Sequence, residues 1–381
     1  MTNQTAIPNL SRRSLLAGVS AAGAVAVLSA CTAPNGAVPG PQVLTVNGSW
    51  ALPDEAAPHE RTWMSWPSSK SIWGPDLAAT QESIVTIARA VMDREPLSIL
   101  ARPSQIAAVR RRLGAAATIH AAPVDDLWAR DTLPLFVTSP GNADSLAASR
   151  VRFNGWGDKQ THAGDRTLSA FVAALVKIPL IDVGLTGEGG GVEGDGAGTL
   201  LANRSSWINE NRNPGWSEKR VEAALLELTG ATRIFWADGV KGQDITDDHI
   251  DASARFTSRT SLVTQVPPLG DVSVWATSAE KLRAILDSKL TLAGTPYTVD
   301  TITDPVSPRG RGSSFLTSYV NYYVCNGAVI IPEFGDSAAD SRARGIVEAH
   351  YPGRDIVQIN IDGVAAGGGG IHCATQQQPV V

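Results

Sequence analysis

The sequence predicts an α/β fold in one domain that spans residues 50–381. Short apolar strand candidates alternate with helical stretches along this part of the chain, which is typical of α/β proteins. From Trp50 onward, no stretch rich in Pro, Gly and Ser and no run of like charges marks a boundary. Polar clusters recur at intervals of roughly 55 to 70 residues, which indicates repeated units that face a common centre.

Runs of apolar and β-branched residues predict strands at residues 97–100, 133–137, 200–202, 261–266 and 328–331. Helical stretches lie at residues 104–113, 217–228 and 338–349. The second of these has clear ends, because Ser217 is a preferred N-cap residue and Gly230 lies just beyond the C-terminus. Strands and helices thus mix along the chain, as the α/β class requires.

The composition is that of a globular protein. Of the 381 residues, 43% are hydrophobic and 18% are charged, and the formal net charge is -5. No dense stripe of Lys and Arg is present, so nucleic acid is not an expected partner. Most of the ten Trp are expected in the core, although a Trp ring can also form a wall beside a planar cation.

The first 30 residues have the pattern of an export signal. Arg12 and Arg13 precede an uncharged apolar run over residues 15–30, which is shorter than the roughly 20 residues of a membrane-spanning helix. The arginine pair resembles bacterial twin-arginine signals. Residues 28–31, Leu-Ser-Ala-Cys, resemble a lipobox that would make Cys31 the lipidated first residue of the mature protein. An uncleaved anchor, or an ordinary secretory signal with a coincidental Cys, is the alternative.

These features predict an exported bacterial lipoprotein at the extracytoplasmic face of the cell envelope. Residues 31–49 are rich in Pro, Gly and Ala and are expected to form a flexible tether between lipid and domain. The lipid on Cys31 would be the only contact with the membrane. Nothing in the sequence defines an oligomeric state.

Cys373 is the candidate nucleophile. It follows four consecutive glycines, residues 367–370, which let the backbone approach a ligand closely, and a thiolate at a pocket floor can attack an electrophile. The alternative is a frayed C-terminus in which the Cys has no function. Cys325 lies in an aromatic and β-branched run and is expected to be buried and inert. A disulfide between the two would consume the proposed nucleophile.

His249 stands among acids in the segment Asp247-Asp248-His249-Ile250-Asp251. It could bind a metal, act in catalysis beside carboxylates, or lie in a solvated acidic loop. A metal site is disfavoured, because the six His show no His-x-His or His-x₃-His spacing. If the segment is an extended strand, His249 and Asp251 lie on the same side and can point into one cavity.

Two further acids stand in distinctive surroundings. Asp131 ends the segment Asp125-Asp126-Leu127-Trp128-Ala129-Arg130-Asp131. Glu188 is flanked by Gly187 and by residues 189–191, all Gly. This stretch lacks the Gly-Lys-Ser/Thr ending of a phosphate-binding loop. The glycines are therefore expected to leave room for a buried carboxylate.

Taken together, these segments resemble the agmatine deiminase family, which belongs to the guanidine-modifying penteins and is related to bacterial peptidylarginine deiminases. The resemblance covers nearly all of residues 50–381 in order. The matching segments are residues 61–67, 128–132, 153–157, 188–190, 211–214, 249–251, 318–321 and 368–379. The resemblance implies a five-fold pseudosymmetric α/β-propeller with the active site on its axis.

The resemblance also implies a role for each matching polar residue. Cys373 would be the nucleophile and His249 the acid and base. Glu188 would orient His249, while Asp131 and Asp251 would grip a guanidinium. The expected substrate-binding set is completed by Trp128, Trp156, Gly369 and Gly370. No metal or organic cofactor is implied.

The implied activity is hydrolysis of agmatine to N-carbamoylputrescine and ammonia through a covalent cysteine intermediate. A peptidylarginine or another small guanidino compound is the alternative substrate, since export is unusual for an enzyme of polyamine synthesis. A lipid-anchored binding protein for cationic amines is the alternative from another class. Binding alone, however, does not need a Cys beside a His and paired acids.

The sequence departs from the usual family pattern in three places. Asp247-Asp248 replaces Asn-Gly before the His, and Gly191-Val192-Glu193 replaces a Ser-Ile-His type of run. Gly370 stands where Asn is common. All three departures are expected at the pocket, where they would bear on the choice of substrate rather than on deimination.

Overall fold

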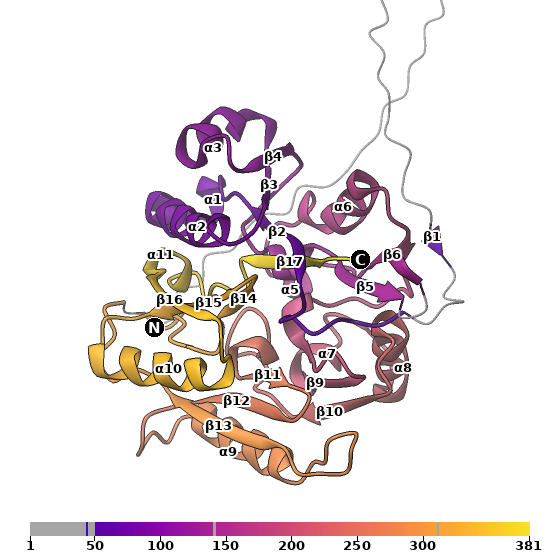
Figure 1. Cartoon of the computed structure of the whole chain (residues 1–381), viewed down its shortest axis with the longest axis vertical. Helices are drawn as coiled ribbons and strands as arrows, with labels where there is room; N and C mark the ends of the chain where they lie inside the picture. Colours follow the sequence, from indigo (N-terminus) through magenta and orange to yellow (C-terminus); the bar gives the residue numbers. More distant parts are fainter. Residues whose placement is uncertain (1–42, 45–49, 140–141, 311) are drawn as a thin grey trace, which may run out of the picture. The chain divides into compact units, whose positions relative to one another are not determined.

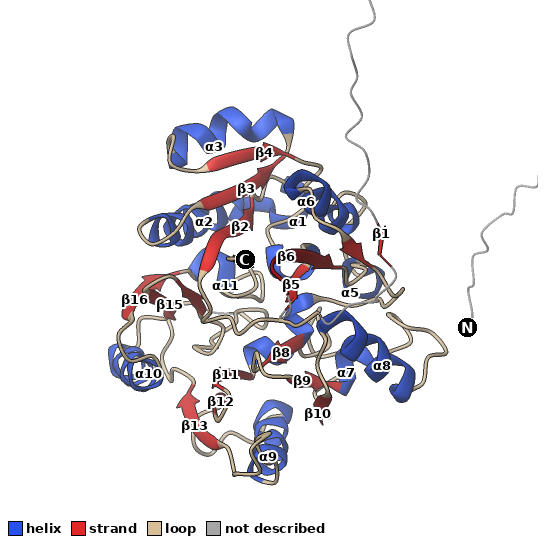
Figure 2. Cartoon of the chain, turned by 45° about the vertical axis from the view of Figure 1, so that its right-hand side comes forward, coloured by secondary structure: helices blue, strands red, loops and turns tan. Residues whose placement is uncertain are grey.

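Five small sheets make up the domain (Figure 1). The computed structural model describes residues 43–44, 50–139, 142–310 and 312–381, which belong to one compact unit. Figure 2 shows the sheets arranged around a common centre, with the longer helices on the outside. The α/β class and the single domain are confirmed. The five sheets also agree with the five-fold arrangement that the family resemblance implies.

The strands are grouped as follows. One sheet contains β17 (Thr375–Pro379), β2 (His59–Ser65), β3 (Leu97–Ala101) and β4 (Thr118–Ala121). The next contains β5 (Leu135–Ser139), β6 (Asn142–Ser149), β7 (Leu180–Ile181) and β1 (Val43–Leu44). The third contains β8 (Val192–Gly194), β9 (Thr199–Asn203) and β10 (Arg233–Ala237). The fourth contains β11 (Ala254–Ser258), β12 (Ser261–Val266) and β13 (Thr298–Thr303). The last contains β14 (Tyr323–Cys325), β15 (Ala328–Glu333) and β16 (Asp355–Asn360).

All five sheets follow one plan. An antiparallel pair of strands is followed by a helical connection to a strand that pairs in parallel. The helices of these connections are α1 (Lys70–Trp73), α2 (Leu77–Met92), α5 (Gly155–Asp158), α6 (Leu168–Val176), α7 (Arg204–Trp207), α8 (Glu218–Thr229), α9 (Val274–Asp287) and α10 (Ser337–His350). The other helices are α3 (Ile106–Leu113), α4 (Ala129–Thr132) and α11 (Asp362–Ala365). The first sheet takes its antiparallel strand, β17, from the end of the chain, so the C-terminal segment closes the domain.

The strands and helices predicted from the sequence are present, with shifted ends. The predicted strand over residues 133–137 begins two residues later, because α4 ends only at Thr132. Helix α8 has the predicted ends: the Ser217 hydroxyl accepts a hydrogen bond from the backbone N–H of Arg220 at 3.3 Å, and Gly230 adopts a φ of 66°. That left-handed conformation favours glycine.

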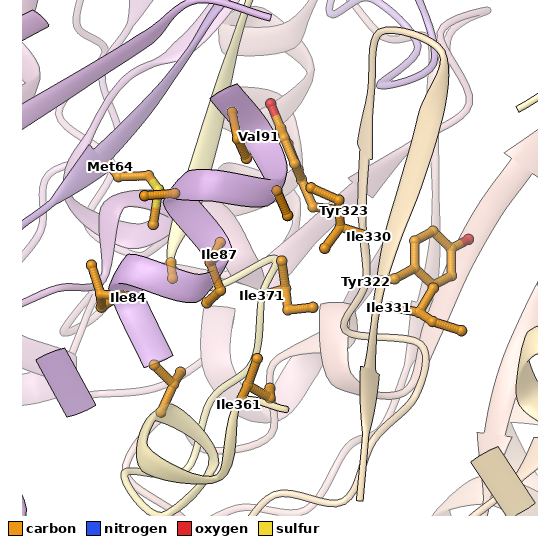
Figure 3. Packing of buried hydrophobic residues seen from close by; sticks show 14 of the residues in the cluster. Met64, Ile84, Ile87, Val91, Tyr322, Tyr323, Ile330, Ile331, Ile361 and Ile371 are labelled. Atoms are coloured by element: carbon orange, nitrogen blue, oxygen red, sulfur yellow. The ribbon is translucent and has the colours of Figure 1, made fainter. Parts of the chain in front are cut away.

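The largest apolar core packs α2 against the sheet of β14, β15 and β16 (Figure 3). Ile84, Ile87 and Val91 lie on one face of α2, at the three- and four-residue spacing of a helix. Burial of each such side chain contributes about 1.5–3 kcal/mol. Ile371 belongs to the same core, so the chain is anchored two residues before Cys373. Cys325 is buried in this core, as expected, and its thiol is free.

The predicted export signal over residues 1–30 and the lipidation site Cys31 lie outside the described residues. So does most of the predicted tether over residues 31–49, but Val43 and Leu44 form β1 and pair in parallel with Leu180 and Ile181. Two residues of that segment are therefore part of a sheet. In the described part of the chain, no helix has both the length and the apolar character needed to cross a membrane.

Candidate active site

Five chain segments converge on one cavity, each lying just before the first strand of a sheet. They are α4, the 3₁₀ helices η4 (Gly189–Gly191) and η5 (Ile250–Ala252), residues 318–322 and residues 366–374. The recurrence of polar clusters in the sequence thus has a structural basis. In residues 318–322, Tyr319 donates its hydroxyl to Asp340 at 2.8 Å in the core, and Asn321 faces the site, where its side-chain amide contacts Cys373.

The cavity is lined by four of the predicted catalytic residues: Asp131, His249, Asp251 and Cys373. Its walls include the predicted binding residues Trp128, Trp156 and Gly369. Glu188 lies behind His249 and does not line the cavity. The cavity therefore brings a thiol, an imidazole and two carboxylates together. Within the described residues, no three His, Cys, Asp or Glu side chains are arranged to hold a metal ion.

His249 is held by carboxylates at both ring nitrogens. Its Nε2 lies 3.2 Å from Oε2 of Glu188, and its Nδ1 lies 3.7 Å from Oδ1 of Asp131. Burial alone would lower the pKa of His249, but the charges of Asp131 and Glu188 outweigh burial and raise that pKa to about 9. His249 is therefore protonated at neutral pH and can donate a proton.

The local backbone of this segment differs from the expected strand. His249 is extended, with φ −69° and ψ 140°, but the following residues Ile250–Ala252 form η5. The argument that His249 and Asp251 lie on the same side of an extended strand is therefore wrong, although both residues do line the cavity. The direction of the Asp251 side chain is therefore set by a 3₁₀ turn, with about three residues per turn, and not by strand geometry.

Glu188 is fixed from behind by Arg212. The guanidinium Nε of Arg212 donates to Oε1 of Glu188 at 2.9 Å, and its Nη1 donates to Asp247 at 2.8 Å. Burial would raise the pKa of Glu188, but the contacts with His249 and Arg212 lower it below its ordinary value. Glu188 is therefore charged, as a residue that orients a protonated imidazole must be. The sequence motif 211–214 contained Arg212, but nothing in it revealed this contact.

Asp131 is held on two sides and faces the cavity. Its Oδ1 accepts a hydrogen bond from the backbone N–H of Gly190 at 3.0 Å, and its Oδ2 accepts one from the indole of Trp156 at 3.0 Å. Burial, reinforced by the charges of Asp251 and Glu188, raises the pKa of Asp131 to about 6. Both oxygens retain lone pairs for a cationic ligand.

Asp251 has one engaged and one free oxygen. Its Oδ2 accepts a hydrogen bond from Nδ1 of His372 at 2.8 Å and lies 3.5 Å from the sulfur of Cys373. Its Oδ1 is buried and has no hydrogen-bond partner among the described residues. A buried carboxylate oxygen without a donor is costly. This free acceptor at the cavity therefore suits a ligand that brings its own N–H groups.

The thiol of Cys373 lies beside these carboxylates. The side-chain amide of Asn321 donates to its sulfur at 3.2 Å. Burial and the charges of Asp251 and Asp131 raise the pKa of the thiol well above its ordinary value. In the absence of a cation, Cys373 is therefore a thiol at neutral pH. It is not bonded to Cys325, so the disulfide alternative is not present.

Two glycines of the site are required by space. A Cβ on Gly190 would lie 2.9 Å from both Asp131 Oδ1 and His249 Nδ1. A Cβ on Gly369 would lie 2.2 Å from the ring of Trp128. Gly370 is not among the residues that line the cavity and packs against the side chain of Asn321, so its contact with substrate stays a prediction.

None of the three departures from the family pattern lines the cavity. Asp247 and Asp248 have φ values of 63° and 69°, the left-handed region in which Asn and Gly are favoured. The carboxylates hold this strained turn: Asp247 accepts from Gly242 N–H at 2.9 Å, and Asp248 accepts from Val240 N–H at 2.9 Å. Glu193 is buried and lies 2.8 Å from the guanidinium of Arg255. The expectation that these residues bear directly on substrate choice is therefore not met.

Comparison with known proteins agrees with this geometry. Residues 51–379 match the model of the Porphyromonas-type peptidyl-arginine deiminase family. Over 352 residues the chain is 30% identical to the agmatine deiminase of Stutzerimonas stutzeri, covering 86% of this chain and 95% of that protein. The fold is similar to that of the agmatine deiminase of Enterococcus faecalis, with a TM-score of 0.81, 25% identity and coverage of 87% and 96% of the two chains. The agmatine deiminase of C. jejuni shares the fold, with a TM-score of 0.72, 20% identity and coverage of 86% and 95%.

Proposed function

The chain belongs to the Porphyromonas-type peptidyl-arginine deiminase family, and from that premise we propose that it hydrolyses agmatine to N-carbamoylputrescine and ammonia. The observation that carries the proposal is the convergence of Cys373, His249 and two carboxylates on one cavity. Relatives named as agmatine deiminases support the choice of substrate.

The two carboxylates suit a planar guanidinium. Asp131 and Asp251 line the cavity, and Oδ1 of Asp251 has no hydrogen-bond partner among the described residues. Each carboxylate can accept N–H bonds from a guanidinium, which carries five donors in a fixed plane when it is alkylated. The rings of Trp128 and Trp156 provide walls for such a cation. Binding would hold the guanidinium carbon beside the sulfur of Cys373.

The substrate itself supports thiol activation. Asp251 and Asp131 raise the pKa of Cys373, so the free thiol is a weak nucleophile. A bound cation neutralises these charges and favours the thiolate. The thiolate of Cys373 could form in two ways: when the substrate binds, or as a resting imidazolium–thiolate pair with His249. The geometry fits activation by the substrate better.

The reaction then follows in two halves. Sulfur attacks the guanidinium carbon and forms a C–S bond, His249 donates a proton to one nitrogen, and the C–N bond breaks to release ammonia. In the second half His249 takes a proton from water, whose oxygen attacks the same carbon. The C–S bond breaks, and the ureido product leaves. Glu188 holds the imidazole and stabilises its charged form.

The cavity favours agmatine, which has no carboxylate, over free arginine, which has one. Among the described lining residues there is no Lys or Arg side chain, so the α-carboxylate of arginine would find no partner. Asp244 lies at the exposed edge of the lining and suits a terminal amine. An arginine peptide, which lacks the free α-carboxylate, is the second candidate and is favoured by the family's name.

The test is ureido-product formation from agmatine, free arginine and an arginine peptide. We expect agmatine to give the highest kcat/KM and Cys373→Ser to abolish turnover. Preference for the peptide would replace agmatine as the substrate. Stoichiometric binding of agmatine without turnover would favour a cationic-amine binding protein.

We further propose that the enzyme is exported and carries lipid on Cys31. Support comes from Arg12 and Arg13, the apolar run over residues 15–30 and the lipobox-like ending. In a bacterial host, the full chain is expected in the membrane fraction. Cys31→Ser should move it to the soluble exported fraction, whereas an unchanged distribution would contradict lipidation.

A further inference from the structure

A buried cluster of charges lies behind the cavity, on the far side of Asp251. It contains three acids and three basic side chains: Glu55, Glu193, Asp251, Arg130, Arg255 and His372. Arg255 lies 2.7 Å from Glu55 and 2.8 Å from Glu193. Buried charges of this kind are stable only when they are paired. With equal numbers of acidic and basic members, each charge in the cluster has a counter-charge.

His372 connects this cluster to the cavity. Its Nδ1 lies 2.8 Å from Oδ2 of Asp251, and its Nε2 lies 2.9 Å from Oε2 of Glu55. The ring is 2% exposed and does not line the cavity. Because both nitrogens face carboxylates, both donate, and a ring that donates from both nitrogens carries a positive charge.

We propose that His372 is a positioning residue for Asp251, and that Glu55 holds the His372 ring from behind. The proposal rests on the proposed deiminase function. It adds the contacts from Glu55 through His372 to Asp251, which lie outside the roles of nucleophile, acid and substrate-binding carboxylate. Asp251 lines the cavity, and His372 engages one of its oxygens while the other has no hydrogen-bond partner among the described residues and is left as a free acceptor.

The contact has two physical consequences. It fixes the plane of the Asp251 carboxylate, which a guanidinium needs in order to form parallel N–H bonds. It also sets a positive charge next to a carboxylate that lies 3.5 Å from the sulfur of Cys373. Burial would raise the pKa of Asp251, but the hydrogen bond and charge of His372 lower that pKa below its ordinary value. Asp251 therefore stays charged and oriented.

Two substitutions of His372 separate positioning from mere structural support. In His372→Asn the amide nitrogen can take the place of Nδ1 and still donate to Asp251. In His372→Gln the longer side chain places its amide near Nε2 and Glu55 and loses Asp251. Both variants lose the positive charge, and His372→Asn leaves the larger void, so a purely structural role would make His372→Asn the worse variant.

The expected result is the opposite order. For agmatine, His372→Gln should lower kcat/KM about 100-fold, mostly through KM, whereas His372→Asn should lower it only about tenfold, since one charge-assisted hydrogen bond accounts for roughly a tenfold difference. The control is His350→Gln, which removes a partly buried histidine that does not line the cavity and is paired with Asp300 at 2.9 Å; it should leave kcat/KM unchanged. Equal losses in the two His372 variants, or a greater loss in His372→Asn, would overturn the proposal.

Two further measurements cover the other outcomes. If either His372 variant fails to fold, Glu55→Gln should raise KM about threefold to tenfold, because a neutral amide holds the ring less firmly than a carboxylate; an unchanged KM would contradict the proposal.

If the wild-type chain does not turn over agmatine, the proposed function fails on its own. Alkylation of Cys373 in the full chain, followed by peptide mass spectrometry, then tests the contact: it should be slower in both His372 variants, and an unchanged rate would contradict the role of His372.

Discussion

The two buried histidines of the site each lie between two carboxylates, but they differ in their access to the cavity. His249 lies between Glu188 and Asp131, and His372 lies between Asp251 and Glu55. Only His249 reaches the cavity. Its longer contact, 3.7 Å to Asp131, leaves Nδ1 near the substrate space, whereas both contacts of His372 are below 3 Å.

This difference separates two uses of one side chain. A protonated ring that lines the cavity can give up its proton to a ligand, while a ring that does not reach the cavity can only hold its two carboxylates. The carboxylates differ accordingly. Burial raises the pKa of Asp131 to about 6, whereas the contact with His372 lowers the pKa of Asp251 despite its burial. Each region can be tested separately.

The largest expected effect is on the cavity side. His249→Gln removes the proton donor, and general acid–base catalysis contributes roughly 100- to 10,000-fold, so kcat for agmatine should fall about 1,000-fold. Binding of agmatine should change far less, in contrast to His372→Gln. Steady-state kinetics of the two variants side by side measure this difference. A kcat within tenfold of wild type would exclude His249 as the acid.

A second test crowds the point where the cavity residues Asp131, His249 and Asp251 meet. In Gly190→Ala the new Cβ would lie within 3.0 Å of oxygen or nitrogen atoms of Asp131, His249 and Asp251. Since a displacement of about 1 Å at a reacting group can cost 100-fold, kcat/KM should fall on the order of 100-fold. If the variant keeps wild-type kcat/KM, catalysis does not require the close distances between these three groups that the structure shows.

The third test uses pH to distinguish the two carboxylates. Asp131, with its pKa of about 6, loses its charge as the pH falls, whereas the guanidinium remains protonated throughout. The Kd of agmatine for the inactive Cys373→Ala variant should therefore rise about tenfold between pH 7 and pH 5. Calorimetric titration measures it, and adding Asp131→Asn should make Kd higher and independent of pH. A flat profile with Asp131 present would contradict the raised pKa.

The smallest effect lies outside both regions and serves as the matched control for Gly190→Ala. Gly345 is exposed within α10, and a Cβ added there has no neighbour within 4 Å. Gly345→Ala should stabilise the domain by about 0.5–1 kcal/mol through helix propensity. Thermal melting should show a small rise in Tm with unchanged kcat/KM. A loss of activity here would mean that glycine replacements act on the site nonspecifically.

Much of this arrangement can be predicted from the sequence. Cys373, His249, Asp131 and Asp251 line one cavity because each precedes the first strand of a sheet, and the spacing of the polar clusters reflects that repeat. Glu188 is buried as its glycine neighbours suggested. Such features can be predicted because each depends on the composition of one short segment of the chain.

Other features depend on contacts between distant segments. Glu55 meets His372 across 317 positions of the chain, and no local pattern around Glu55 signals it. The contact between Arg212 and Glu188 and that between Asn321 and Cys373 are likewise invisible in the sequence. The expected strand at His249 was wrong because a 3₁₀ turn follows it, and hydrophobic alternation cannot reveal a turn made of buried polar residues.

The most direct measurement is to quench the wild-type enzyme with acid during turnover of agmatine and to map adducts by peptide mass spectrometry. We predict an adduct on Cys373 with the mass of agmatine less one ammonia, and none on Cys325. Ammonia release without any adduct on Cys373, together with turnover by Cys373→Ser, would contradict the assignment of the nucleophile.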